Sequence, residues 1–389
     1  MLFNSLEFLL FFPIVTTLYY FLPHKFRWLL LLVASCLFYA AAIPVYLFVL
    51  FTLIIIDYFS AILIEQYQGK FKKLFLIISI VSMCSALFVF KYFNFFVTNL
   101  DAFARVFHWN LPITTLQLLL PIGLSFHTFQ SLSYVIEVYR GNQKAERNFG
   151  IYALYVMFYP QLVAGPIERP YNLLHQFHEE HTFDYQRVVD GLKLMAWGMF
   201  KKVVIADRLA LLVNQVYGNP HDFSGPLLII ATFFFAFQIY CDFSGYTDIA
   251  IGAAQVMGFR LMDNFNRPYF SKSIAEFWKR WHISLSSWFR DYVYIPLGGN
   301  RVSDQRLYFN LSLTFLISGL WHGANRTCFV WGALNGFYII ISLATYNFRR
   351  KFVHLITLDR HPIIHKFFKM VLTFTLVCFG WIFFRAKNI

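Results

Sequence analysis

Residues 44–64 read PVYLFVLFTLIIIDYFSAILI, a run of 21 residues with one charged side chain, Asp57. A bilayer core about 30 Å thick is crossed by roughly 20 apolar residues in a helix. Similar apolar stretches lie at residues 3–22, 28–42, 74–99, 113–136, 226–256, 307–345 and 364–385. The sequence therefore predicts an all-α polytopic integral membrane protein.

The composition agrees with lipid as the main solvent. Of the 389 residues, 58% are hydrophobic and 14% are charged, and the mean hydropathy is +0.55, values outside those of a soluble domain. The stretch 307–345 is expected to hold two helices separated at residues 323–326. Residues 151–167 and 187–215 are more polar and are expected to be re-entrant, interfacial or buried. We expect about nine to eleven membrane-embedded segments.

Basic residues alternate between loops, which predicts an orientation. Lys25 and Arg27 lie in one loop, and two further basic loops lie at residues 70–73 and 140–147. Because Lys and Arg favour the cytoplasmic side, these loops are expected there, with the N-terminus outside. The net charge of +13 follows from this topology, and no nucleic-acid partner is predicted.

The longest hydrophilic interruption, residues 259–306, is also expected on the cytoplasmic face, because its Lys and Arg residues outnumber its acids. Ser273 and Glu276 form a capping box at its centre. Apolar residues then recur at helical spacing from Ile274 to Leu285, with basic residues between them. This pattern predicts an amphipathic helix on the membrane surface.

Several kinds of chemistry lack their sequence marks. The chain has no P-loop and no G-x-G-x-x-G, H-E-x-x-H or G-x-S-x-G motif. Its five cysteines lie far apart, so neither a disulfide framework nor a zinc site is predicted. His175, His178 and His181 are spaced by three residues, unlike a helical zinc site, and are expected in a solvated loop.

His322 is the main catalytic candidate. It lies in SGLWHGAN, residues 318–325, directly after an apolar run. A neutral imidazole there can accept a proton from a hydroxyl that attacks an acyl carbon, and then return it to a leaving thiolate. Its flanking glycines let a backbone or a substrate approach closely. The alternative is a packing histidine that is hydrogen-bonded to a neighbouring helix.

His282 lies on the predicted surface helix, where it can orient an acyl donor or assist His322; the alternative is an ordinary interfacial side chain. Arg290 and Asp291 follow, and then GGNR at residues 298–301. These residues form a basic turn suited to a phosphate-bearing donor. A contact with lipid headgroups is equally compatible with them.

Two further features interrupt apolar stretches. Asp242 and Asp248 lie within residues 226–256, with Gly245 between them to loosen the helix, and carboxylates at that depth need partners. They either line a polar tunnel or pair with basic residues elsewhere. Residues 160–167, PQLVAGPI, contain two prolines; because broken backbone at membrane depth must be buried or line a cavity, we expect this segment at a central cavity.

Three segments resemble the membrane-bound O-acyltransferases: FWKRWHISL (277–285), DYVYIPLGGNR (291–301) and GLWHGAN (319–325). Four more are similar to the bacterial alginate O-acetyltransferase branch of that family: PIGLSF (121–126), YVIEVYRG (134–141), AGPI (164–167) and DFSGY (242–246). The resemblance covers nearly the whole chain in the same order.

The resemblance implies one membrane-embedded domain over residues 1–389, a helical bundle around a central tunnel with re-entrant and interfacial amphipathic helices. Relatives usually continue beyond this chain's last residue, so a C-terminal truncation is expected. His322 corresponds to the family's invariant active-site histidine and His282 to its second functional position. Arg326 stands where the family usually has an apolar or aromatic residue. Substrate contacts are expected at Asp242, Arg290, Asp291, Asn300, Arg301, Trp321 and Asn325.

The implied activity is transfer of an acyl group, acetyl in this branch, from a cytoplasmic thioester donor to a polysaccharide such as alginate outside the membrane. The donor, acetyl-CoA or an acyl carrier protein, acts as co-substrate, with no bound cofactor or metal. Expected partners are membrane lipid, an extracytoplasmic acyltransferase and a polysaccharide synthesis and secretion complex in a bacterial inner membrane. D-alanyl transfer to teichoic acid-type polymers, or a non-enzymatic transporter or channel, are the alternatives.

Overall fold

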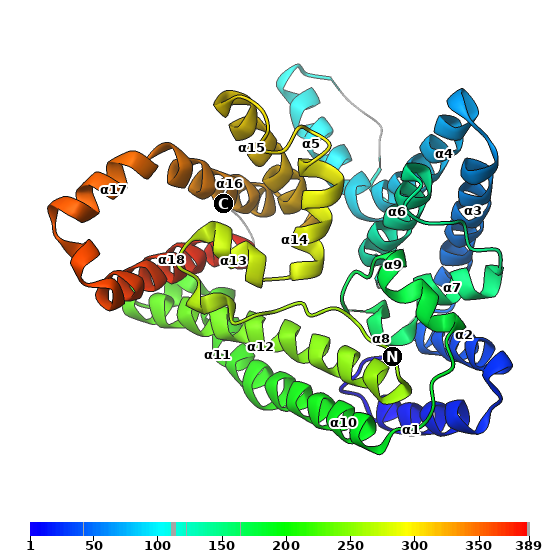
Figure 1. Cartoon of the computed structure of the whole chain (residues 1–389). Helices are drawn as coiled ribbons and strands as arrows, with labels where there is room; N and C mark the ends of the chain where they lie inside the picture. Colours follow the sequence, from blue (N-terminus) through cyan, green and yellow to red (C-terminus); the bar gives the residue numbers. More distant parts are fainter. Residues whose placement is uncertain (42, 110–113, 122, 164, 387–389) are drawn as a thin grey trace. The chain divides into compact units, whose positions relative to one another are not determined.

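The computed structural model describes residues 1–41, 43–109, 114–121, 123–163 and 165–386 (Figure 1). Within these ranges the regular structure is helical, apart from an isolated bridge between Phe265 and Trp281. The chain forms two compact units. Unit 1 comprises Met1–Phe200 and Gly245–Met262, and unit 2 comprises Lys201–Ser244 and Asp263–Ile389. The prediction of a single domain over residues 1–389 stays a prediction.

Unit 1 contains the first ten α-helices and the end of α12. They are α1 (Leu6–Phe21), α2 (His24–Ala40), α3 (Tyr46–Gln66), α4 (Gly69–Leu87), the π-helix η1 (Phe88–Tyr92), α5 (Phe93–Val106), α6 (Leu124–Arg140), α7 (Phe149–Met157), α8 (Tyr159–Leu162), α9 (Pro170–Leu173), the 3-10 helix η2 (Leu174–His178) and α10 (Tyr185–Met199).

Unit 2 contains the remaining helices and most of α12. They are the π-helix η3 (Phe200–Ala206), whose first residue belongs to unit 1, α11 (Asp207–Gly218), η4 (Pro220–Asp222), α12 (Gly225–Met257), η5 (Pro268–Phe270), α13 (Ile274–Arg280), α14 (Ile283–Phe289), the π-helix η6 (Arg290–Tyr294), α15 (Asp304–His322), α16 (Arg326–Ala344), α17 (Tyr346–Leu355), η7 (Leu358–Arg360) and α18 (Pro362–Arg385).

Several helices are long and apolar enough to cross a bilayer. Among the described residues there are five: Tyr46–Gln66, Gly69–Val106, Gly225–Met257, Arg326–Ala344 and Pro362–Arg385. Their outward faces carry many exposed large apolar side chains, as lipid-facing helices do. The all-α polytopic fold is thus confirmed, while the predicted total of nine to eleven embedded segments stays a prediction.

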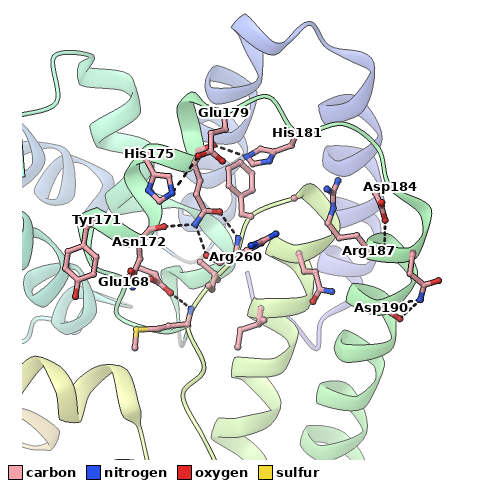
Figure 2. A pocket seen from close by; sticks show the side chains of 18 residues that line it. Glu168, Tyr171, Asn172, His175, Glu179, His181, Asp184, Arg187, Asp190 and Arg260 are labelled. Atoms are coloured by element: carbon pink, nitrogen blue, oxygen red, sulfur yellow. Dashed lines mark hydrogen bonds and ion pairs between the residues drawn. The ribbon is translucent and has the colours of Figure 1, made fainter.

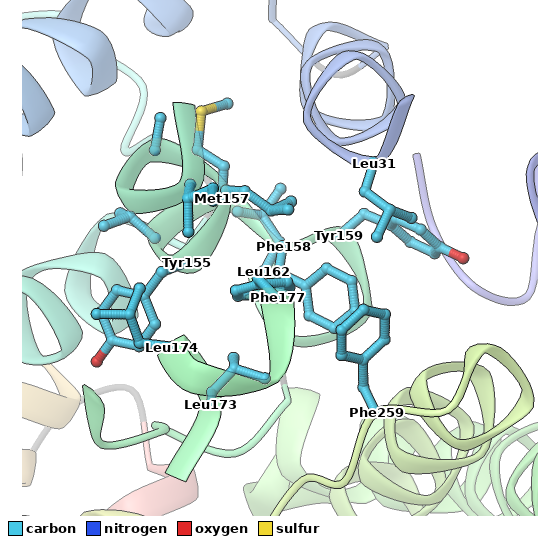
Figure 3. Close-up of a cluster of buried hydrophobic side chains, with 14 of the residues drawn as sticks. Leu31, Tyr155, Met157, Phe158, Tyr159, Leu162, Leu173, Leu174, Phe177 and Phe259 are labelled. Carbon is cyan, nitrogen blue, oxygen red and sulfur yellow. The ribbon is translucent and has the colours of Figure 1, made fainter. Parts of the chain in front are cut away.

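The core of unit 1 surrounds α7, whose residues from Gly150 to Met157 are all buried. Phe158 and Tyr159 continue this core, and the ring of Phe158 lies 5.1 Å from Phe259 and 5.3 Å from Phe177 (Figure 3). An apolar helix without a polar face is expected to be buried on all sides. Residues 151–162 are therefore buried, which is one of the three alternatives predicted for residues 151–167. Ala164 lies outside the described residues, and a cavity-lining role for this segment stays a prediction.

The predicted helix at residues 113–136 was wrong in its first part. Residues 114–121 are not helical, and α6 begins only at Leu124. Gly123 has a left-handed backbone (φ 75°), and Pro121 disfavours helix before it. The Asn94 side chain instead pairs with the Leu116 backbone, accepting from its N–H (2.8 Å) and donating to its carbonyl (2.7 Å).

The basic loops gather at one end of unit 1. The Lys72 ammonium lies 5.1 Å from the centre of the Tyr139 ring, and Arg147 forms an ion pair with Glu65. Arg27 Nη1 donates to the carbonyl of His181 (2.6 Å). Because His178, three residues before His181, lies 2.8 Å from Glu146 beside Arg147, the three basic loops adjoin one another, and their cytoplasmic placement stays a prediction.

Candidate active site

His282 lies at a break between two short helices. α13 begins after Ser273, whose Oγ accepts from the Glu276 N–H (3.1 Å), so the predicted helix start is confirmed. The helix ends at Arg280, and His282 has a left-handed backbone (φ 45°, ψ 57°) before α14. The prediction of one continuous surface helix through Leu285 was therefore wrong.

A neighbouring segment explains the break, because it takes the backbone hydrogen bonds that a continued helix would use. Asn266 N donates to the carbonyl of Arg280 (2.9 Å), and Ile283 N donates to the carbonyl of Asn264 (3.0 Å). The Asn264 side chain also accepts from both N and Oγ of Ser284 (3.1 and 2.8 Å). A left-handed backbone at a residue with a side chain costs about 1–2 kcal/mol, so this pairing holds His282 in place.

The His282 ring is enclosed. The residue is 2% exposed, and its ring meets Phe243 edge-on at 4.6 Å and lies 6.2 Å from Trp321. Burial, and in second place the nearby His322 imidazole, lower the pKa of His282 well below its usual value. His282 is therefore neutral near pH 7.

His322 is the last residue of α15. Its ring contacts Trp321 on the same helix (4.8 Å), Trp331 of α16 (4.9 Å) and Phe384 of α18 (5.4 Å). The side chain is only partly buried. Three helices thus fix the imidazole while part of it stays reachable. The predicted separation of two helices at residues 323–326 is confirmed, since α15 ends at His322 and α16 begins at Arg326, which is exposed.

Close backbone contact between α15 and α16 sets the position of His322. A Cβ atom on Gly319 would lie 2.5 Å from the carbonyl oxygen of Cys328, and one on Gly332 would lie 2.5 Å from that of Phe315. Only glycine permits this approach. It brings the Trp331 ring of α16 against His322.

A layer of tryptophans lies behind the histidine. Trp331 stacks on Trp381 with 6.0 Å between ring centres and 15° between planes, and it meets Trp278 edge-on at 5.6 Å. Asn335 ties the layer together, because its Oδ1 accepts from Trp278 Nε1 (3.3 Å) and its Nδ2 donates to the Trp331 carbonyl (2.8 Å). The sequence reasoning missed Trp331, Trp381 and Asn335, since aromatic residues are frequent throughout the chain.

Asp242 forms an ion pair. Its Oδ1 lies 2.7 Å from Lys202 Nζ, which also lies 2.8 Å from an oxygen of Asp207. The two alternatives for Asp242 were a place in a polar tunnel and a pair with a basic residue, and the structure shows the pair. α12 continues through Gly245 from Gly225 to Met257, the loosening expected there stays a prediction, and Asp248 belongs to unit 1. The sequence reasoning missed Lys202, whose only signal was a basic pair within an otherwise apolar stretch.

The basic turn follows α14. Arg290 Nε lies 2.7 Å from Asp291 Oδ1, and positive φ angles at Gly298 (111°) and Gly299 (57°) turn the chain back. Asn310 of α15 donates to the Gly299 carbonyl (3.1 Å). Asn300 and Arg301, which follow the glycines, are exposed.

A groove of about 470 Å³ lies between this region and α15. Lys279 and Arg290 contribute cations to its wall, and Phe315 and other apolar side chains line most of the rest. Ser318 also lines it, one helical turn before His322. The groove thus links the basic residues to the helix that carries the catalytic candidate.

Two predicted substrate contacts have structural partners. Asn325 caps α16, because its Oδ1 accepts from the Cys328 N–H (2.8 Å) and the Thr327 hydroxyl (3.0 Å). Trp321 is buried between His282 and His322. A substrate contact at either residue stays a prediction.

Unit 1 holds a separate polar cavity of about 1200 Å³, which sequence reasoning missed (Figure 2). Glu168 lies at its wall, fully buried, and accepts from the Met262 N–H (2.5 Å). Burial raises the pKa of Glu168 to about 7. The three histidines that are spaced by three residues have different partners here. His175 lies 3.8 Å from Glu179, and His181 bonds to the Gln176 carbonyl (2.9 Å).

His178 has a different partner, since its Nε2 lies 2.8 Å from Oε2 of Glu146. Each of the three histidines thus has its own neighbour, and no group of three or more His, Cys, Asp or Glu side chains among the described residues could hold a metal ion.

Comparison of the sequence with known proteins identifies a family and several similar proteins. The family model of MBOAT, the membrane-bound O-acyltransferase family, matches residues 147–383. The chain is 42% identical to a probable alginate O-acetylase AlgI of Pseudomonas aeruginosa, over all of this chain and 73% of that protein. It is 41% identical to the Azotobacter vinelandii protein of the same name, over all of this chain and 76% of that protein. A peptidoglycan O-acetyltransferase of Helicobacter pylori is 37% identical, over 93% of this chain and 71% of that protein.

Proposed function

The chain belongs to the membrane-bound O-acyltransferase family, and on that premise we propose that it passes an acetyl group from a cytoplasmic thioester donor across the membrane. The acetyl group then reaches hydroxyls of a secreted or cell-envelope polysaccharide such as alginate. That the chain is an O-acyltransferase, and a multi-pass protein of a bacterial inner membrane, follows from the family match and the apolar helices. Donor, acceptor and route are the proposal.

The observation that carries the proposal is the placement of two imidazoles in unit 2 on either side of the Trp321 ring, 6.2 Å from it for His282 and 4.8 Å for His322. His322 is partly exposed and held by three aromatic rings. His282, neutral and buried, is close enough for the His322 charge to lower its pKa. Two nearby histidines, one reachable and one enclosed, suit proton transfer during acyl exchange.

The chemistry assigned to His322 is general acid–base catalysis. Its unprotonated ring nitrogen takes the proton of an acceptor hydroxyl while that oxygen bonds to the thioester carbonyl carbon. The carbon–sulfur bond then breaks, and the imidazolium returns the proton to the leaving thiolate. His282 supports the imidazolium by staying neutral, since a second positive charge nearby would raise its energy.

The donor is assigned to the groove beside α15. Lys279 and Arg290 suit the phosphates of acetyl-CoA or the acidic surface of an acyl carrier protein. The apolar remainder suits an uncharged arm that brings the thioester toward His322, and the volume of about 470 Å³ falls within the range of small-molecule sites. Arg301 and Asn300 extend this cationic surface, and Asp291 orients Arg290.

The names of the relatives support acetyl as the acyl group and a cell-envelope glycan as the acceptor. An extracytoplasmic acyltransferase and a polysaccharide synthesis and secretion complex are proposed as partners, because the acceptor lies outside the membrane.

Replacement of His322 tests the proposal. His322→Ala is expected to lower acetylation of the extracytoplasmic glycan by about 10²- to 10⁴-fold, the usual contribution of a general base. His322→Gln keeps volume and hydrogen bonding but takes up no proton near pH 7, so it is expected to be as inactive as Ala. A transporter or a packing histidine predicts that Gln restores function. Membrane insertion is checked for each variant, and substantial acetyl transfer by an inserted His322→Gln protein would refute the mechanism.

A further inference from the structure

The segment between the last two candidate spans forms a distinct surface. α16 and α18 are both apolar enough to cross a bilayer and pack against each other. α17 lies at the turn between them (orange in Figure 1). A short helix that joins two packed, adjacent spans lies where those spans leave the hydrocarbon, at the membrane surface.

One side of α17 is apolar and uncovered. Phe348, Phe352 and Leu355 follow each other at spacings of four and three residues, which places them on one helix face. They are 71%, 51% and 79% exposed. The stripe is followed by Ile363 and Phe367 at the start of α18, which are also strongly exposed. Such a stripe on a surface helix fits the boundary between headgroups and acyl chains.

The same segment is strongly basic. Residues 346–369 carry six Lys or Arg side chains and one acid, Asp359. Arg350 and Lys351 are exposed and form no ion pair with a described acidic residue. Asp359 instead bonds to His354 (2.7 Å). The positive charge of α17 is therefore not neutralised by the acid of its own segment.

Arg349 differs from its two neighbours. Its guanidinium donates to the Ser342 carbonyl and to the Thr345 hydroxyl (3.2 Å), at the end of α16. Arg349 thus fastens α17 to the preceding span, while Arg350 lies opposite the apolar stripe and Lys351, three residues after Phe348 and four before Leu355, borders it. The cations with a structural task and those without one can be separated by mutation.

We propose that α17 and the first turns of α18 form a binding surface for anionic phospholipids. Phe348, Phe352 and Leu355 enter the acyl-chain boundary, and Arg350 and Lys351 contact the phosphate-bearing headgroups, joined by the exposed Lys366 and Lys369 of α18. A bilayer is the occupant because both flanking helices lie in it, and an anionic headgroup is complementary to the surplus of cations. This binding is independent of the acyl-transfer proposal.

Lipid retention tests the charge requirement. The purified chain is exposed to phosphatidylglycerol and phosphatidylcholine of equal chain length, and the retained lipids are counted by native mass spectrometry. Wild type is expected to retain phosphatidylglycerol preferentially. Each cation near an anionic surface contributes about fivefold in affinity, so Arg350→Ala with Lys351→Ala is expected to lower that preference by roughly 25-fold. Inorganic phosphate at millimolar concentration is expected not to displace the lipid.

The control removes the same charge elsewhere. Arg105→Ala with Lys193→Ala deletes two exposed cations that already have acidic partners, Asp101 and Asp190, and is expected to leave the preference unchanged. Equal retention of both lipids by wild type, equal loss in both double variants, or displacement by free phosphate would each overturn the proposal.

The geometry is tested by photocrosslinking. A benzophenone side chain at Phe352 is expected to crosslink to acyl chains in vesicles of phosphatidylcholine with 30% phosphatidylglycerol, a proportion of about one anionic lipid in three chosen to give a clear surface potential. The same group at Asn347, on a different side of α17, is expected not to do so. Crosslinks from Phe352 to protein alone, or equal lipid crosslinking at both positions, would show that the stripe does not face the bilayer.

Discussion

At the scale of single residues, His282 combines two properties that are separable by mutation. Its backbone is left-handed, and its ring is buried against Phe243. Asn tolerates the left-handed region far better than Ala does, because its short polar side chain bonds locally. Substitutions at this position therefore distinguish a residue that shapes the chain from one that takes part in the reaction.

We expect His282→Asn to keep the thermal midpoint of unfolding close to wild type while acetyl transfer falls strongly. His282→Ala is expected to lose activity as well and to be less stable by about 1 kcal/mol, because Ala pays the backbone cost. Thermal unfolding in detergent and glycan acetylation are measured on the same preparations. Near-normal activity of the Asn variant would make His282 a structural residue only.

Glu168 makes a second residue-level prediction, on pH. Its pKa is raised by burial from 4.5 to about 7, so the folded state binds the proton more tightly than the unfolded state. The stability that Glu168 contributes is therefore complete below about pH 4.5 and falls as pH rises from there through about 7, by roughly 3 kcal/mol in total. Glu168→Gln is expected to remove this slope. Parallel pH profiles of unfolding for wild type and variant would contradict it.

At the scale of elements, the contact between α15 and α16 decides where His322 lies. The two helices touch through Gly319 and Gly332, which leave no room for a Cβ. Gly336, one turn further along α16, is less crowded, since its Cβ would lie 3.3 Å from the Phe315 side chain at the nearest. The same substitution is therefore expected to cost much more at Gly332 than at Gly336.

Gly332→Ala is expected to destabilise the protein by about 1–3 kcal/mol, the usual cost of overpacking, and to reduce acetyl transfer by moving Trp331 away from His322. Gly336→Ala is the matched control. It is expected to be close to neutral, because the preference of Ala over Gly for helix, about 1 kcal/mol, offsets the small shift that a Cβ 3.3 Å from Phe315 requires. Unfolding midpoints and activity are compared for both; equal effects would mean that helix propensity, and not the close approach, determines the outcome.

At the scale of the whole molecule, the arrangement of charged loops predicts how the chain crosses the membrane. The loops of Arg27, Lys72 and Arg147 lie at one end of unit 1. The connection at η4 in unit 2 is nearly free of basic residues. The positive-inside pattern assigns the first group to the cytoplasm and the η4 connection to the outside.

A cysteine at Lys72 is accordingly expected to react with an impermeant reagent only from the cytoplasm, and a cysteine at Asp222 only from outside. The five native cysteines, which are free thiols, are replaced first. Reaction of both positions from the same side would refute the orientation.

Local pattern was sufficient for much of this protein. Apolar length gave the membrane-spanning helices, the capping box gave the start of α13, and the glycines beside His322 marked the end of α15. These features depend on residues near one another in the chain, so propensity and periodicity predict them.

Other features depend on partners that are distant in sequence. The break at His282 arises because residues 264 and 266 take its neighbours' hydrogen bonds, and Asp242 is paired because Lys202 lies 40 positions earlier on another helix. Hydrogen bonds and ion pairs of this kind leave no periodic signal, and only the tertiary structure decided them.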